Sequence, residues 1–455
     1  MKPYTEYRDA EGGWLGQVPA HWAVRRMKYV VREVDCRSSD GREQLLRASQ
    51  YTGVTPRHRA DGLDEADTRA ESLVGYKRVQ PEDLVINIML AWNGSMGVSR
   101  YSGIASPAYC VYRFAPGMNP WYFHHLLRSP HYKARIKASS TGVVESRLRL
   151  YSEDLGRIEA LVPPPEEQAA IVRFLDWANG RLERAIRAKR KVIALLNEQK
   201  QAIIHRAVTQ TQAAGASVKA SGVEAIGDIP QHWEVLPFVR CAVERADYRG
   251  ATPEKVDEGI FLVTAKNVRK GWIDYECSRE YVRPAEYPKI MRRGLPRLED
   301  VLLTMEAPLG NVALVDREEI AIAQRVVRFR LDGERLRPRF ALFALNSTYF
   351  QDQLQLRATG STAQGIKASK LPQLLVACPP PAEQERITEQ LDKELKPLQQ
   401  ALKRFEREIE LLVEYRTRLV ADVITGRLDV RAAAELQPVE SSAEAESVDE
   451  EESIP

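Results

Sequence analysis

Four segments of the chain carry closely spaced basic, amide and hydroxyl side chains, the types that hydrogen-bond to the edges of nucleic-acid bases. They are LLRASQYTGVTPR (from Leu45), STGVVESRLRL (from Ser140), TAKNVRKGW (from Thr264) and GSTAQGIKASKL (from Gly360). Arg and Lys can donate to O6 and N7 of guanine, and Asn and Gln can pair with N6 and N7 of adenine. The candidate DNA-contacting residues are Arg47, Ser49, Gln50, Tyr51, Arg57, Arg147, Arg149, Lys266, Asn267, Arg269, Lys270, Gln364, Lys367 and Lys370. The same residue types also form ordinary surface loops, so both interpretations remain open at this point.

A second candidate for chemistry is NPWY, at Asn119, which is similar to the Asn-Pro-Pro-Tyr of amino-methyltransferases. In those enzymes the Asn and the Pro carbonyl hold an exocyclic amine, and the aromatic ring stacks on a flipped base. The chain has no Gly-rich strand-loop that would hold S-adenosylmethionine, and RPRF, from Arg337, stands at the matching place of its second half. We therefore predict that Asn119 caps a helix and that Pro120 takes its first position.

The remaining candidates for catalysis or metal binding are weaker. EQK, at Glu198, matches part of a nuclease signature, but it lies within a helical pattern and no Pro-Asp precedes it. His124 and His125 are adjacent, so they point to different sides of a helix and make a poor metal pair. The five cysteines have no Cys-x-x-Cys spacing, which is typical of reduced thiols, and no G-x-x-x-x-G-K-[ST] phosphate loop occurs. We predict neither catalytic residues nor a bound metal in this chain.

The order of several motifs indicates a tandem duplication. GQVPAHWAV, from Gly16, returns as GDIPQHWEV, from Gly227, and PPPEEQAAI, from Pro163, returns as PPPAEQERI, from Pro379. PEDLVIN pairs with LEDVLLT, and LLNEQKQAIIHRAVT pairs with LLVEYRTRLVADVIT, so that all four shifts lie between 211 and 217 residues. Four matches in one order at nearly one offset predict two copies of the same domain.

Each copy is predicted to fold as a mixed α/β domain followed by long helix. In the first copy, β-branched and aromatic runs favour strands over 82–89 and 108–114, and residues 119–139 form a helical pattern interrupted at Pro130. In the second copy we expect strands over 260–265, 300–305 and 322–330, and the matching helix over 337–356.

Apolar residues beyond each triple proline repeat at the three-four spacing of a coiled-coil seam. The seam residues are Leu182, Ile186, Ile193, Leu196 and Ile203 in the first copy, and Leu398, Leu402, Phe405, Ile409, Leu412 and Leu419 in the second. Gly180 and Pro397 stand at corresponding places, so we expect a short lead helix and then a long helix of roughly 28 residues in each copy. The long helices are expected to pair with each other, antiparallel; the alternative is that each packs on its own domain.

Composition restricts the class of protein. A chain of 455 residues is too long for one core and fits two domains. No apolar run reaches the length of a membrane span and the N-terminus has no signal-peptide core, so we expect a soluble cytoplasmic protein. The net charge is +3, but the tail after Arg431 holds eight acids and no Lys or Arg, which leaves residues 1–431 at +11. A basic folded body suggests a polyanionic partner, and the tail is expected to be disordered.

With these features in order, the chain resembles the DNA specificity subunits of type I restriction-modification enzymes over nearly its whole length. The motifs that carry the resemblance include GDIPQHWEV, VTAKNVRKGWID, GSTAQGIKASKL, PPPAEQERI and LLVEYRTRLVADVITGRLDV, with their counterparts in the first copy. The resemblance implies an α+β fold, a tandem pseudo-repeat of two target-recognition domains separated by two long antiparallel coiled-coil helices. The expected segments are recognition domains over 1–162 and 226–378, helical regions over 163–210 and 379–431, a linker over 211–225 and an acidic tail over 432–455.

The resemblance also implies function and partners. Each recognition domain would read one half of a split double-stranded DNA sequence, and the helices would dock two modification (methyltransferase) subunits and, in the full enzyme, restriction subunits. S-adenosylmethionine, ATP and magnesium would belong to those partner subunits, with no cofactor in this chain. Two alternatives stay open: a self-contained adenine methyltransferase that uses NPWY, and a coiled-coil scaffold without a role on DNA.

Overall fold

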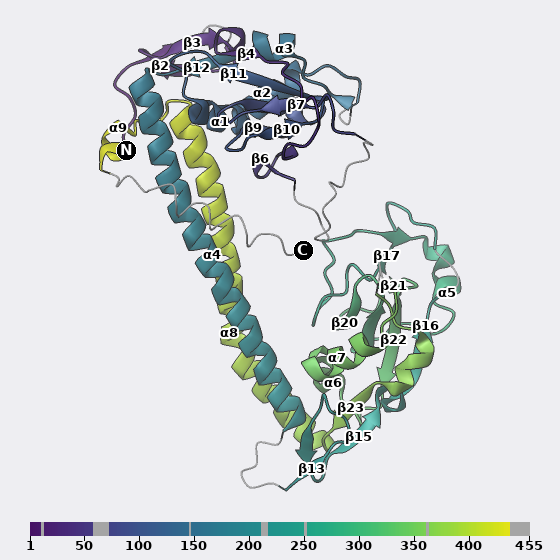
Figure 1. The fold of residues 1–455 in the computed structure, drawn as a ribbon. Helices are drawn as coiled ribbons and strands as arrows, with labels where there is room; N and C mark the ends of the chain where they lie inside the picture. The colour runs from purple at the N-terminus through teal and green to yellow at the C-terminus, as the bar shows by residue number, and fades with distance from the viewer. Residues whose placement is uncertain are drawn as a thin grey trace. The chain divides into compact units, whose positions relative to one another are not determined.

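The computed structural model describes residues 1–10, 13–57, 72–144, 147–210, 217–249, 253–360 and 364–436 (Figure 1). The chain divides into two compact units. Unit 1 comprises Met1–Lys189 and Arg407–Pro455, and unit 2 comprises Arg190–Glu406. Unit 2 is therefore an insertion within unit 1, and the chain passes between the units twice, each time within a long helix.

Unit 1 is built on a four-stranded antiparallel sheet in the order β4-β11-β8-β9. Four two-stranded ribbons, β1-β2, β3-β12, β5-β6 and β7-β10, complete its strands. The strands are β1 (Tyr7–Asp9), β2 (Gln17–Pro19), β3 (Ala23–Arg26), β4 (Val31–Glu33), β5 (Leu46–Ser49), β6 (Gly53–Pro56), β7 (Lys77–Val79), β8 (Leu84–Asn87), β9 (Met96–Val98), β10 (Gly103–Ala105), β11 (Tyr109–Phe114) and β12 (Glu159–Val162). The helices of its domain are η1 (Met27–Tyr29), η2 (Ala91–Asn93), α1 (Pro120–Arg128), α2 (Pro130–Ser139) and α3 (Ser152–Arg157).

Unit 2 repeats this plan with the four-stranded sheet β16-β22-β19-β20, and adds the three-stranded sheet β18-β17-β21 and the ribbons β13-β14 and β15-β23. Its strands are β13 (Val218–Ala220), β14 (Asp228–Pro230), β15 (Glu234–Pro237), β16 (Ala242–Asp247), β17 (Ile260–Val263), β18 (Tyr281–Val282), β19 (Val301–Met305), β20 (Leu309–Leu314), β21 (Ile320–Ile322), β22 (Val326–Leu331) and β23 (Leu375–Cys378). Its domain helices are η4 (Phe238–Cys241), η5 (Pro284–Glu286), α5 (Tyr287–Ile290), α6 (Pro338–Asn346), α7 (Thr348–Arg357) and η6 (Ala368–Gln373).

The two units share unusual backbone geometry, which confirms the tandem repeat. Glu82, before β8, and Glu299, before β19, both have positive φ, 70° and 65°. The next residue in each unit, Asp83 or Asp300, accepts a hydrogen bond from the backbone N–H three residues earlier, at 2.8 and 2.9 Å. These residues belong to the matched segments PEDLVIN and LEDVLLT, so this sequence match corresponds to the same turn in both copies.

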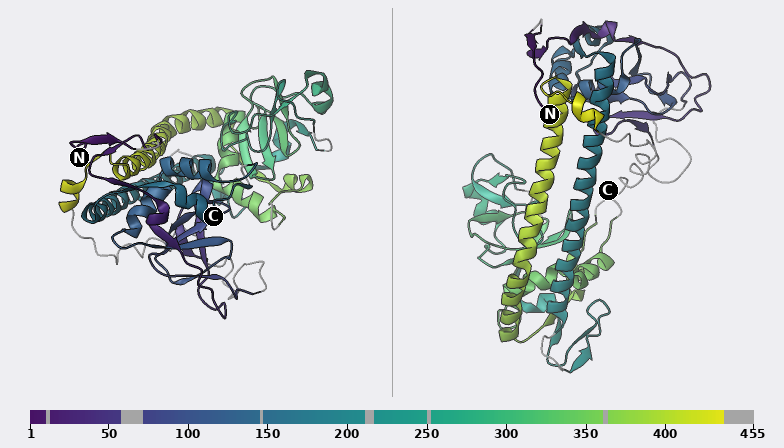
Figure 2. Two further views of the ribbon diagram at one scale, coloured as in Figure 1. Left: turned by 90° about the horizontal axis from the view of Figure 1, so that it is seen from above. Right: turned by 90° about the vertical axis from the view of Figure 1, so that its left-hand side faces the viewer.

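Two long helices, α4 (Pro165–Thr209) and α8 (Pro381–Ile424), run through both units as uninterrupted ribbons (Figure 2). The predicted breaks at Gly180 and Pro397 are therefore wrong. A glycine inside a helix costs only about 1 kcal/mol relative to alanine, which the packing of the flanking turns offsets. Pro397 is exposed, so the carbonyl of Lys393, which loses its N–H partner, stays accessible to water.

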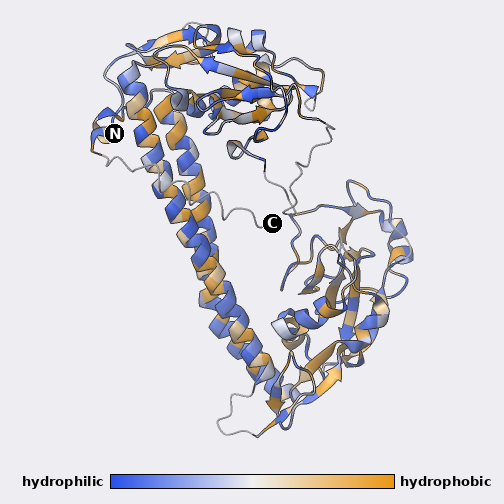
Figure 3. Ribbon diagram, viewed as in Figure 1, coloured by the Kyte–Doolittle hydropathy of each residue, from blue (hydrophilic) through white to orange (hydrophobic). Residues whose placement is uncertain are grey.

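Within unit 1 the first half of α4 and the last half of α8 pack together, antiparallel. Glu183 and Arg416 form an ion pair of 3.3 Å, and Lys189 and Glu408 form one of 2.5 Å. All eleven predicted seam residues are buried or half-buried, whereas Leu195, which lies between two of them, is 54% exposed. Figure 3 shows hydrophobic stretches alternating with hydrophilic ones along both long helices.

The ends of the long helices also belong to the cores of their units. In unit 1, one hydrophobic cluster contains Ile171 and Phe174 of α4, Val423 of α8, and Trp22 and Tyr122 of the domain. In unit 2, the corresponding cluster joins Val208 of α4 and Leu391 of α8 to Trp233 and Phe340. Helix pairing and packing on the domain, which the sequence left as alternatives, both occur.

The structure corrects four further expectations. Residues 218–220 of the predicted linker form β13, which pairs with β14 as β1 pairs with β2. The strand expected over 322–330 is divided between β21 and β22, and the helix expected over 337–356 is divided at Ser347, as the first copy is at Ser129. Residues 432–435 of the predicted tail belong to the short helix α9 (Arg431–Glu435), and the tail beyond 436 lies outside the described residues.

Candidate nucleic-acid interface

The repeated His-Trp segment and the repeated Pro-rich segment meet in unit 1. Glu167, at the start of α4, is buried and accepts hydrogen bonds from the indole N–H of Trp22 at 3.0 Å and from the hydroxyl of Tyr4 at 2.5 Å. Its second oxygen lies 2.8 Å from Nε2 of His21. Burial and the carboxylate of Glu167 raise the pKa of Tyr4 far above its ordinary range, so the hydroxyl remains a donor. The two repeated motifs form one junction between the domain and its helix.

Unit 2 contains the same junction. Glu383, at the start of α8, lies 2.7 Å from Nε2 of His232 and accepts from the indole N–H of Trp233 at 3.2 Å. The sequence showed that these motifs repeat but did not show that they contact each other. The contacts between these motifs have a structural role, because they tie the start of each long helix to its domain.

The glutamine after each of these acids ties the helix to NPWY or to its counterpart. Gln168 accepts from the backbone N–H of Asn119 at 2.7 Å, and Gln384 accepts from that of Arg337 at 2.8 Å. The side chain of Asn119 caps α1 by accepting from the N–H groups of Trp121 and Tyr122, at 3.0 and 3.3 Å. The prediction of a structural cap is confirmed, and the Asn119 oxygen is engaged in it.

In unit 1 the first candidate segment forms the hairpin β5-β6. Arg47 points outward and its Nε lies 3.4 Å from the hydroxyl of Thr55, Ser49 and Gln50 are half-buried, and Tyr51, in the turn, is 82% exposed. Arg57 is exposed directly after β6. An exposed tyrosine beside an arginine and an amide has the side chains that base stacking and base-edge hydrogen bonding require.

Arg128, the last residue of α1, holds this hairpin turn in place. Its guanidinium donates to the backbone carbonyls of Ser49, Gln50, Tyr51, Gly94 and Met96, at 3.1, 3.0, 3.0, 3.1 and 2.6 Å. The first three belong to the hairpin turn and the last two belong to the segment that enters β9. Burial lowers the pKa of Arg128 below its ordinary value. The sequence did not single out this arginine, because the leucine-rich helix around it looks like ordinary core.

The second candidate segment of unit 1 returns to the same region. Thr141 and Arg149 exchange two backbone hydrogen bonds of 2.9 Å, and the N–H of Leu150 donates to the carbonyl of Ile88, at the end of β8. Arg147 and Arg149 are both exposed. The β8-β9 connection therefore lies against both candidate segments, and unit 1 brings them to one region.

In unit 2 the segment TAKNVRKGW forms a turn on β20. Lys266, Arg269 and Lys270 are exposed, and Nε of Arg269 lies 3.3 Å from a carboxylate oxygen of Asp274. Trp272, which is not among the candidate DNA-contacting residues, is 57% exposed. The backbone N–H of Gly271 donates to the carbonyl of Val312, which fixes the turn to the sheet.

Asn267 is a correction to the candidate set. Its side chain is 0% exposed, and its oxygen accepts from the N–H and the hydroxyl of Thr264, at 2.9 and 2.7 Å. Its amide donates to the carbonyls of Asp274 and Ser278, both at 2.8 Å. A side chain with these four bonds shapes the turn and has no free edge for a base. The residue type fitted base reading, but the same polar groups also satisfy a tight turn.

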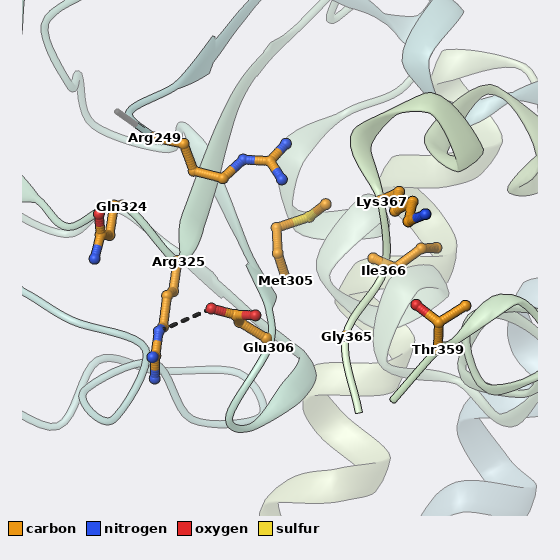
Figure 4. Close-up of a pocket in the computed structure, with 9 residues that line it drawn as sticks. All are labelled: Arg249, Met305, Glu306, Gln324, Arg325, Thr359, Gly365, Ile366 and Lys367. Atoms are coloured by element: carbon orange, nitrogen blue, oxygen red, sulfur yellow. Dashed lines mark ion pairs between the residues drawn. The ribbon is translucent and has the colours of Figure 1, made fainter. Parts of the chain in front are cut away.

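The last candidate segment of unit 2 is held as its counterpart in unit 1 is held. Thr359 and Gly365 exchange backbone hydrogen bonds, and the N–H of Ile366 donates to the carbonyl of Met305, at the end of β19. These residues line a cleft with Arg249, Arg325 and Lys367 (Figure 4). Arg325 is paired with Glu306 at 2.9 Å. Gln364 and Lys370 are exposed beside it. The cleft is polar and carries three cations, two of which the sequence did not identify.

The part of the chain that the structure describes also lacks two other kinds of feature. No group of three His, Cys, Asp or Glu side chains there could hold a metal ion. No helix there has the length and apolar character that crossing a membrane requires.

Taken together, the fold and these surfaces define a class of protein: a tandem repeat in which two α+β domains, each with exposed basic loops, are joined by two continuous helices. No protein-family model matches the chain. The chain is 22% identical to the type I restriction enzyme MjaVIII specificity subunit of Methanocaldococcus jannaschii over 449 residues, which cover 95% of this chain and 98% of that protein. It is also 22% identical to the type I restriction enzyme EcoBI specificity subunit of Escherichia coli over 326 residues, 69% of this chain and 67% of that protein.

A chain in a solved structure of a type I restriction-modification system shares the fold. It superposes with a TM-score of 0.64 over 90% of this chain and 99% of that one, at 16% sequence identity. The resemblance to type I specificity subunits that the motifs indicated is confirmed, since it extends through both copies and both long helices.

Proposed function

We propose that this chain is the DNA-recognition subunit of a type I restriction-modification complex and performs no catalysis itself. The observation that carries the proposal is the similarity to the MjaVIII specificity subunit along 95% of the chain. A relation of this length includes both units and both helices, which a shared DNA-binding module alone would not.

In this proposal each unit reads one half of a split double-stranded DNA sequence. The exposed Arg47, Tyr51 and Arg149 are the candidates in unit 1, and Lys266, Arg269 and Lys367 are the candidates in unit 2. Equivalent backbone contacts at the ends of β8 and β19 support a common use of the two surfaces. Basic side chains at these positions bind phosphates or guanine, and only a base contact carries sequence information.

The proposed partners are two modification subunits and the restriction subunits of the complex. S-adenosylmethionine, ATP and magnesium would be bound by those partners, and this chain would hold none of them. The engagement of the Asn119 side chain in capping α1 favours this division of labour over a self-contained methyltransferase, because a catalytic amide needs a free oxygen for the target amine.

The test is to express the chain with a modification subunit from its own genome and to map methylated adenines in the host DNA. The proposal expects one bipartite sequence with two short half-sites and a nonspecific spacer of fixed length. Methylation at a single undivided sequence would contradict the proposal that each unit reads one half of the target. Calorimetry on the isolated chain is the second arm, and saturable micromolar binding of S-adenosylmethionine would contradict a non-catalytic role.

A further inference from the structure

The internal repeat supplies a comparison between two equivalent corners of the protein. Helices α1 and α6 each have nine residues and end at Arg128 and Asn346. Five residues further on, in α2 and α7, stand Lys133 and Gln351. The second residue of each pair lies over a glycine of positive φ, Lys133 over Gly94 (95°) and Gln351 over Gly310 (86°). Unit 1 thus has two cations where unit 2 has two neutral amides.

The equivalence extends to individual atoms. A Cβ built on Gly94 would lie 2.6 Å from Cε of Lys133, and one built on Gly310 would lie 2.6 Å from Oε1 of Gln351. The two long side chains therefore occupy the same space over the same glycine.

The amides of unit 2 show that the architecture needs no charge at this corner. Asn346 donates to the carbonyl of Val312 on β20 at 3.2 Å, and Gln351 donates to that of Gly310 at 2.8 Å. In unit 1, Arg128 alone donates to the matching carbonyls of Met96 and Gly94. Lys133 is thereby left without the anchoring task that Gln351 performs.

The side chain of Lys133 is half-buried. Its side chain forms no hydrogen bond and no ion pair with any residue that the structure describes. Burial, and then the charge of Arg128, lower its pKa from 10.5. Arg128 itself is satisfied by carbonyl groups, which neutralise no charge. Among the described residues no carboxylate pairs with either side chain, and two neighbouring cations of this kind form a place where an anion is stabilised.

We propose that Lys133, with the charge of Arg128 behind it, binds a phosphate group of the nucleic-acid backbone. This inference rests on the proposed function and deepens it by separating a sequence-independent contact from the base-reading candidates. The position supports a backbone phosphate, because Arg128 also holds the turn of Gln50 and the exposed Tyr51. Phosphate contacts fix the register of a protein on the duplex while neighbouring side chains read the bases.

The experiment measures DNA binding by the full chain between 50 and 200 mM salt, for the wild type and three variants. Lys133→Gln installs the residue that unit 2 uses at this place, Lys133→Arg keeps the charge, and Arg187→Gln removes an equal charge from an exposed position on α4. Neutralising one phosphate contributes about 0.9 to the slope of log affinity against log salt. A fourfold rise in salt should therefore weaken the wild type about 3.5-fold more than Lys133→Gln.

Three further results complete the expectation. Lys133→Arg and Arg187→Gln should keep the wild-type slope, the loss in Lys133→Gln should be the same for target and unrelated DNA, and Lys133→Gln should melt no lower than the wild type. An unchanged slope in Lys133→Gln, with or without a lower melting temperature, would overturn the phosphate site and leave the proposed function intact. Absence of DNA binding by the wild type would overturn both.

Discussion

Nε2 of His21 lies 2.8 Å from a carboxylate oxygen of Glu167, across 146 residues of chain. The same contact recurs between His232 and Glu383 at 2.7 Å. In each unit a tryptophan N–H donates to the same buried acid, so one carboxylate joins the entry of the domain to the start of its long helix.

Replacing Glu167 by Ala should destabilise unit 1. The change leaves the buried N–H of Trp22 and the hydroxyl of Tyr4 without an acceptor, and unsatisfied buried donors cost about 1–3 kcal/mol. Chemical denaturation followed by tryptophan fluorescence measures the effect. Glu166→Ala, at an exposed neighbouring position, is the matched control and should stay within about 0.5 kcal/mol of the wild type. Equal stability of both variants would show that the junction is not stabilising.

Asn267 and Lys266 are adjacent, but their substitutions should have different effects. Asn267→Ala removes four hydrogen bonds from a buried turn, so it should lower the melting temperature by several degrees. Lys266→Ala removes an exposed charge, so it should weaken DNA binding and leave the melting temperature unchanged. Thermal unfolding and a binding titration on both variants separate the two roles. Loss of binding with full stability in Asn267→Ala would restore that residue to the base-reading set.

Unit 1 should lose stability in acid through His124. Burial, followed by the charges of His125, Arg128 and Arg100, holds the pKa of His124 well below 6.5, and its Nδ1 accepts from the backbone N–H of Val98. A group whose pKa is lower in the folded state binds fewer protons there, so its contribution is complete above pH 6.5 and decreases below that value. We expect a decrease of up to about 1.4 kcal/mol per pH unit below this point.

The other unit suggests the variant that tests this prediction, because Leu342 stands there at the position of His124. His124→Leu should be less stable at pH 7, because the N–H of Val98 loses its acceptor, but its stability should fall less steeply between pH 6.5 and 5. Urea unfolding at both pH values measures this difference. Parallel pH profiles for the wild type and the variant would assign the acid sensitivity to other groups.

The long helices should determine the spacer between the half-sites. We expect four residues added after Lys189 in α4, and four after Glu406 in α8, to lengthen the spacer by one or two base pairs. The reason is that four residues add about 6 Å at 1.5 Å each, against 3.4 Å per base pair. Mapping the methylated sites of the double insertion tests this. Unchanged half-sites with an unchanged spacer would mean that the partner subunits determine the separation.

The sites of insertion follow from the structure and could not be chosen from the seam alone. An insertion near the end of α4, after His205, would fall inside unit 2, because Ile204 and Val208 belong to its core. Nδ1 of His205 also lies 3.0 Å from the hydroxyl of Thr348. The boundary between the units, at 189 and 406, avoids both cores.

Much of the fold could be predicted because the repeat doubles each local signal. Strands β8 and β11 and the Asn119 cap lie where periodicity and capping rules placed them. The helix breaks failed because a local preference against Gly180 and Pro397 is small beside the packing of 45 and 44 residues of continuous helix.

The candidate surface was less predictable, because residue type does not reveal burial. Asn267 has the right side chain for a base and uses it inside its own turn. Arg128 and Lys133 lie in helices whose sequences look like ordinary core-packing helices. Only the comparison with Asn346 and Gln351 distinguishes these two residues from their neighbours. A signal for Lys133 was present in the sequence as a mismatch between the copies, but it gains meaning only once both are known to face equivalent glycines.

The insertion of unit 2 within unit 1 has a consequence for the order in which the protein folds on the ribosome. Unit 2 has all its residues once Glu406 has been added. The core of unit 1 also needs Leu419, Val423 and Val430, and Tyr7 near the start of the chain bonds to the carbonyl of Gly426. At about 5–20 residues per second, unit 1 waits for its last elements on the order of ten to fifty seconds after Lys189 is made. The half of the protein that emerges first is therefore completed last. During that interval the apolar face of its unfinished core is exposed and can be bound by a chaperone.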